Sequence, residues 1–152
     1  MRLTETLQQW LKEQEWQEEP QIDEEHQASS TTFRLSVSDI GLKCWYECLE
    51  AGEVFKLYMY CSDVKVPEAR LEEVQKFACE FSKALYLGQL RFFREDRVMC
   101  YYSALDMEAA AFEPRHITNL LNAGMNAMQG ALPKYLAICF AGKSAEEVLA
   151  EE

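Results

Sequence analysis

Thiols are the side chains in this 152-residue sequence with the widest chemical range, since they can form disulfides, hold metals or act as nucleophiles. The six cysteines are spread through apolar segments without a CxxC pair, at Cys44, Cys48, Cys61, Cys79, Cys100 and Cys139. Cys44 and Cys48 are the nearest two, but four strand steps would separate their α carbons by roughly 13 Å, too far for a disulfide or a shared metal. We predict reduced, mostly buried thiols and no metal site.

Other catalytic arrangements are equally weak. His26 and His116 are the only histidines, which makes a poor ligand set, and no nucleophile elbow or oxyanion loop is recognisable. A carboxylate pair such as Glu80 and Asp96 is not distinguished from the other acids of the chain. We therefore predict no catalytic residue, no cofactor and no enzymatic activity.

One near-match to a phosphate-binding loop occurs at Gly142-Lys143-Ser144. The loop needs a further glycine five residues before Gly142, and that position is Ala137. The segment from Ser144 to Glu147 fits a capping box better, in which the hydroxyl and the carboxylate each accept from an amide at a helix start. The missing glycine therefore excludes nucleotide hydrolysis through a phosphate-binding loop.

Charge restricts the partners. A net charge of −11 and a pI near 4.7 predict repulsion from nucleic acids and anionic lipid surfaces, and the aromatic residues of the strand patterns have no basic stripe beside them. No run approaches the length of a membrane helix, and residues 1–10 lack the pattern of a secretory signal. We expect a cytoplasmic protein that binds neither nucleic acid nor membrane.

The elements that would position any site follow from hydrophobic periodicity. Residues 1–16 predict a helix, because Leu3, Leu7, Trp10 and Leu11 form an apolar stripe. Residues 17–32 are acidic and rich in hydroxyl groups, which predicts a flexible connection with a weak strand near residues 16–22. Period-two alternation then predicts a three-strand meander over residues 33–61, in which Gly52 is available for a positive φ in the loop 50–53.

Two helical regions and a hairpin follow. Residues 67–87 predict a central amphipathic helix that starts at Pro67 and ends at Gly88, and residues 89–105 predict a hairpin. Residues 114–151 predict C-terminal helices, the first with a polar stripe. Its amides could bind a peptide backbone or polar ligand, or could simply face water; they are Asn119, Asn122, Asn126 and Gln129.

These elements predict one domain over residues 1–152. The fold class is α+β, with two layers: an antiparallel sheet of about five strands packed against helices, in the order α-β-β-β-α-β-β-α-α. The apolar face of the central helix should pack on that sheet.

This order, with the long helix leading into residues 87–92, resembles the YbjN-type family and, more distantly, type III secretion chaperones. Two C-terminal segments, 132–136 and 142–149, are similar to cyanobacterial-type members of that family. The resemblance spans residues 3–149. It implies a chaperone-like fold in a non-catalytic, often dimeric domain that binds other polypeptides or acts in regulation. The long connection and the C-terminal tail favour a housekeeping or regulatory role over secretion.

We therefore expect a protein-interaction module that binds a polypeptide through a sheet edge or apolar groove, because the predicted sheet is rich in aromatic residues, lacks a catalytic motif and belongs to an acidic chain. A homodimer is expected. The alternative is a small-ligand sensor or an enzyme with a pocket between the sheet and the helix of Asn119 to Asn126. The candidate binding residues are Trp45, Phe55, Tyr58, Asn119, Asn122 and Asn126.

Overall fold

The computed structural model describes residues 1–151, and its elements follow the predicted order closely. The helices are α1 (Arg2–Glu13), α2 (Leu71–Ser82), α3 (Pro114–Phe140) and α4 (Ala145–Ala150), with a short 3₁₀ helix, η1 (Glu68–Arg70), before α2. The strands are β1 (Gln21–Asp23), β2 (Ala28–Val37), β3 (Ile40–Leu49), β4 (Val54–Tyr60), β5 (Gln89–Phe93) and β6 (Val98–Asp106). The predicted α+β class is confirmed.

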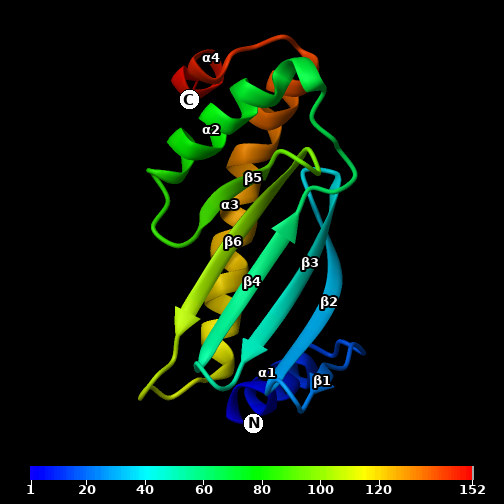
Figure 1. The fold of residues 1–152 in the computed structure, drawn as a ribbon, viewed down its shortest axis with the longest axis vertical. Coiled ribbons are helices and arrows are strands. Elements are labelled where there is room, and N and C mark those ends of the chain that lie inside the picture. The colour runs from blue at the N-terminus through cyan, green and yellow to red at the C-terminus, as the bar shows by residue number, and fades with distance from the viewer. Residues whose placement is uncertain (152) are drawn as a thin grey trace.

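All six strands form one antiparallel sheet in the order β1-β2-β3-β4-β6-β5. In Figure 1, α3 runs behind β4 and β6, α1 lies at the end of the molecule near β1, and α2 and α4 lie at the opposite end. Helices α1 and α2 both pack against α3, and α2 also packs against β5. Within residues 1–151 the helices therefore cover one face of the sheet, and the face turned toward the viewer is uncovered.

Alternation along the strands builds the core between the sheet and α3. Tyr46, Leu57, Met59 and Tyr101 all face the helices and are fully buried. At Gly124 of α3, an added Cβ would lie 2.6 Å from the sulfur of Met59 and 2.9 Å from the ring of Tyr101. The helix can approach β4 and β6 this closely because residue 124 has no side chain.

The segment 17–32 is more regular than predicted. It contains β1, and β2 begins at Ala28 rather than at Phe33, so the sheet has six strands instead of about five. Its hydroxyl groups suggested a loop, but Ser29 and Thr31 alternate toward the core as strand residues do. Ser29 hydrogen-bonds the hydroxyl of Thr4 at 2.7 Å, which satisfies its polar group inside the fold.

The central helix is shorter than the predicted range of 67–87, because Pro67 precedes the 3₁₀ helix η1, α2 itself begins at Leu71, and it ends at Ser82. The Ser82 hydroxyl donates to the carbonyl of Ala78 at 2.7 Å and accepts from the N–H of Leu90 in β5 at 2.8 Å, so it ties the helix end to the sheet. Residues 83–88 form a loop. Gly88, the predicted helix end, has a positive φ of 76°, but it precedes β5 instead of ending the helix.

The prediction of a positive φ at Gly52 is wrong. In the loop between β3 and β4 that conformation falls on Glu53, with φ 54°, and the equivalent last loop residues Gln27 and Arg97 have φ 49° and 55°. Each of the three donates its N–H to the carbonyl of the residue three positions earlier. Position in the loop, rather than residue type, therefore decides where the left-handed conformation falls.

The C-terminal region 114–151 contains two helices, α3 and α4. The Ser144 hydroxyl accepts from the N–H of Glu147 at 3.1 Å, as predicted for the cap of α4. The carboxylate of Glu147, however, accepts from that same hydroxyl at 3.3 Å rather than from an amide. Glu73 of α2 accepts from the N–H of Ala145 at 2.8 Å instead, which fastens α4 to α2.

Two fully buried tyrosines allow a matched test of this core. The Tyr135 hydroxyl donates to the carbonyl of Val64 at 2.8 Å, whereas the Tyr46 hydroxyl has no partner among residues 1–151. We expect Tyr135→Phe to lower the free energy of unfolding by about 1 kcal/mol, and Tyr46→Phe to leave it unchanged or raise it by about 1 kcal/mol. Urea denaturation followed by circular dichroism measures both, and equal losses would contradict the assignment.

Candidate functional site

The uncovered face of the sheet carries a continuous group of aromatic side chains. Trp45 of β3 is directly opposite Tyr58 of β4, and Tyr58 is opposite Tyr102 of β6. Tyr60 of β4 and Phe93 of β5 point to the same face, because strand side chains alternate and their sequence neighbours face the helices. We call these five residues the aromatic row; all five are partly exposed.

The rings of the aromatic row contact one another across four strands. Ring centroids are 4.7 Å apart for Trp45 and Tyr58, and 5.0 Å apart for Tyr58 and Tyr102. Tyr60 stacks on Trp45 at 4.8 Å and on Phe93 at 5.8 Å, with the ring planes within 19° of parallel in both pairs. These contacts hold the rings in place, so the face presents a preformed aromatic surface.

Four cationic side chains occupy the same face. Arg91 of β5 lies over the ring of Tyr102, 3.8 Å from its centroid, and Lys56 of β4 lies 5.9 Å from the same ring. Lys43 of β3 is directly opposite both Tyr60 and Arg34 of β2 in the strand register. The face therefore combines π surfaces with charged donors.

These cations are only partly neutralised. Glu47 lies 3.9 Å from Lys56, and Asp63, in the loop after β4, lies 3.9 Å from Arg34. Asp106 occupies the end of β6 on the same face. Arg34 and Lys43 nevertheless oppose each other directly, and like charges in that arrangement destabilise a sheet. An anion bound between them would remove that cost.

The thiol and imidazole groups of the chain do not lie together on this face. Cys100 of β6 points toward it but is fully buried, and burial raises the pKa of its thiol to about 12. His26, in the loop between β1 and β2, forms a side-chain hydrogen bond with Asp23. His116, at the start of α3, stacks on the ring of Phe112. Within residues 1–151, no group of His, Cys, Asp or Glu is placed to hold a metal ion.

The structure separates the predicted site residues into three places. Trp45 and Tyr58 lie together in the aromatic row. Phe55 faces the opposite side, where it is fully buried against Phe112 and Tyr46. The amides Asn119, Asn122 and Asn126 are exposed on α3, on the side away from Gly124 and the sheet.

Sequence reasoning missed Tyr60, Phe93, Tyr102 and the cations beside them. It found no basic stripe, and that statement is wrong for Trp45 and Tyr58, because the cations come from four strands and meet only through the sheet register. The sequence did contain one signal for this face: side chains two positions apart in a strand point to the same side of the sheet. Even positions in β4 and β6 carry Lys56, Tyr58, Tyr60 and Tyr102.

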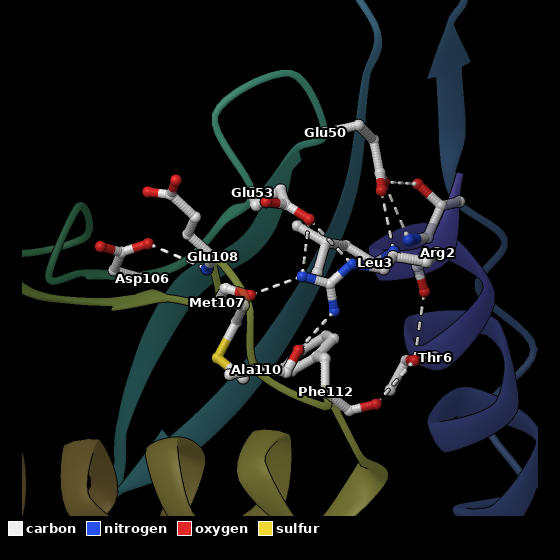
Figure 2. Close-up of polar contacts among 11 residues, drawn as sticks. Arg2, Leu3, Thr6, Glu50, Glu53, Asp106, Met107, Glu108, Ala110 and Phe112 are labelled. Atoms are coloured by element: carbon white, nitrogen blue, oxygen red, sulfur yellow. Dashed lines mark hydrogen bonds and ion pairs between the residues drawn. The ribbon is translucent and has the colours of Figure 1, made fainter.

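A hollow of about 680 Å³ lies at the start of α1, and three of the charged side chains that line it, Arg2, Glu50 and Glu53, already have partners. Figure 2 shows the Arg2 guanidinium donating to Glu53, at 2.9 Å from Nη2, and to the carbonyls of Met107 and Ala110. Glu50 accepts from the N–H of Leu3 at 2.8 Å and from the N–H and hydroxyl of Thr4. These contacts fasten α1 to the loops at this end of the sheet, so we assign the cluster a structural role.

The fold and the site define an α+β protein with one helix-covered sheet face and one uncovered face of aromatic and cationic side chains. No protein-family model and no curated protein matches the chain. The similarity to the YbjN-type family therefore stays a prediction. Among the helices of residues 1–151, none combines the length and the apolar character needed to span a membrane.

Proposed function

We propose that this chain is a non-catalytic, cytoplasmic protein-interaction module that binds an acidic segment of another polypeptide across the uncovered face of its sheet. The observation that carries the proposal is the aromatic row with four cations beside it. Side chains of the bound segment rest on the rings, and its carboxylates approach Arg34, Lys43, Lys56 and Arg91.

Charge supports an acidic partner. The whole chain has a net charge of −11, yet the strand positions of this face carry four cations and three carboxylates, Glu47, Asp106 and Asp23 of β1. An anion bound between Arg34 and Lys43 would relieve the repulsion between these two directly opposed cations. A nucleic acid would meet the same cations, but its backbone extends beyond this face into the field of an acidic protein, which disfavours it.

The predicted binding mode through a sheet edge has less support. Along the β5 edge, Ser82 already bonds the N–H of Leu90 and α2 packs beside the strand. At the other edge, β1 has only three residues. The alternative function, a ligand pocket between the sheet and α3, would not use the three asparagines, because they lie on the outer side of that helix.

The first test selects peptides from a random dodecapeptide phage library on the immobilised full-length chain, and measures synthetic copies by fluorescence anisotropy. We expect the selected peptides to be rich in Asp and Glu with interspersed apolar residues. Two variants, Trp45→Ala/Tyr58→Ala and Lys56→Glu/Arg91→Glu, should each weaken binding at least about tenfold, because stacking and paired charges are lost. Added salt should weaken it as well.

The matched control is Lys12→Glu/Lys76→Glu, which makes the same charge change at exposed positions of α1 and α2. It should retain binding, and circular dichroism confirms that each variant is folded. The proposal is wrong if no peptide is enriched, or if the selected peptides bind the face variants as tightly as the parent. Tighter binding of a labelled twelve-nucleotide uridine oligomer through Trp45 and Tyr58 would also overturn it.

A further inference from the structure

The outer side of α3 is free of charge over most of its length. Residues 116–133 contain no Asp, Glu, Lys or Arg, although these types make up 27% of the chain. Within residues 116–133, the exposed residues opposite Gly124 form a line that we call the uncharged face: Asn119, Asn122, Asn126, Gln129 and Pro133. A solvent-facing helix of an acidic protein ordinarily carries charged residues there.

An apolar groove of about 340 Å³ adjoins this face at Asn126. It lies between α3 and the loop after α2, and Phe81, Leu85 and Ala127 contribute to its walls. Tyr86 of that loop is fully exposed beside the groove, and Leu87 is 45% exposed. Exposed apolar residues next to an uncharged helix face mark a surface that gains from being covered.

We infer that a second copy of this chain covers the uncharged face, with α3 packed on α3 across a two-fold axis near Asn126. The distribution of charge on the chain favours a second copy as the partner that covers this face. Two copies with a net charge of −11 each repel one another, and the uncharged face lets them meet without opposing like charges. Asn126 is the midpoint of the uncharged line from Asn119 to Pro133, so a symmetric contact centres there.

The amides also favour a copy of the same chain. An Asn side chain both donates and accepts, so a row of amides can hydrogen-bond to an identical row, whereas rows of carboxylates or ammonium groups repel their own copy. The axis near Asn126 brings the two apolar grooves together and covers Tyr86 and Leu87. The inferred surface is on the helical side of the sheet, so it is independent of the binding proposed for the aromatic row.

Sedimentation velocity over a hundredfold concentration range, up to about 0.5 mM, tests the inference. We expect a species of twice the 17.6 kDa chain mass to form as concentration rises. Asn126→Glu places two carboxylates at the axis, and Asn126→Lys places two ammonium groups there, so each variant alone should dissociate at least about ten times more readily. An equal mixture of the two should dimerise again, because opposite charges then meet.

Gln75→Glu is the control, since it adds the same charge at an exposed position of α2. It should leave the association unchanged. A wild-type chain that stays monomeric throughout overturns the inference. Dimers of Asn126→Glu as tight as wild type, or a variant mixture that stays monomeric, overturn it too, because the axis would then lie elsewhere. Peptide binding at the aromatic row is measured separately, so the two results are distinguishable.

Discussion

Replacing Trp10 by alanine is expected to lower the free energy of unfolding by about 3 to 5 kcal/mol, as large aromatic truncations in cores do. The Trp10 side chain is 2% exposed, its ring contacts Tyr46 and Trp16 at centroid distances of 5.4 and 5.0 Å, and its Nε1 donates to the Thr118 hydroxyl at 2.9 Å. The substitution removes this packing and the link from α1 to α3. Urea denaturation followed by far-ultraviolet circular dichroism gives the change.

Trp45→Ala is the matched control, because Trp45 is partly exposed on the uncovered face. Its loss should cost about 1 kcal/mol from ring contacts with Tyr58 and Tyr60, well below the Trp10 effect. The two variants thus separate a tryptophan that holds the fold from one assigned to binding. Equal destabilisation by the two would mean that the aromatic row is a second core.

Gly124→Ala is expected to lower the free energy of unfolding by about 1 to 2 kcal/mol, even though alanine favours helix. The added methyl group would lie 2.6 Å from the sulfur of Met59 and 2.9 Å from the ring of Tyr101, and both side chains are fully buried. The helix must therefore move away from the sheet or its neighbours must shift, which costs more than the gain in helix propensity. Chemical denaturation of both proteins measures the difference.

Gly130→Ala in the same helix should have the opposite sign. An added Cβ there meets only the ring edge of Phe81, at 3.6 Å, which is an ordinary contact. The helix then gains about 1 kcal/mol from the propensity of alanine over glycine. Stabilisation by both substitutions would show that α3 is not held as close to β4 and β6 as described.

Much of the fold was predictable because periodicity reports burial. The apolar stripe of α1 and the alternation through β3 and β4 each assign side chains to the core, and the structure buries them there. The start of β2 was not predictable from composition, because Ser29 and Thr31 are buried hydroxyls in a segment that otherwise has the composition of a loop. The end of α2 depends on a bond from Ser82 to Leu90, a contact that only the folded chain reveals.

The candidate site was predicted only in part, for a geometric reason. Trp45 and Phe55 looked equivalent as strand aromatics, but antiparallel register sends them to opposite faces. Arg91 is far from Trp45 in sequence and reaches the same surface only because β6 lies between β4 and β5. Pairing across strands cannot be derived from the spacing of residues in one chain.

The one-sided placement of the helices has a consequence for valency. Because α3 and the uncovered sheet face lie on opposite sides of the chain, a dimer joined through α3 directs its two aromatic rows away from each other. A ligand with two acidic segments on one flexible chain could then occupy both, and its second attachment would be intramolecular. Avidity of this kind can exceed the single-site affinity by about 10²-fold or more when the linker spans the sites. Such a dimer would distinguish repeated acidic segments from single ones without any further contact.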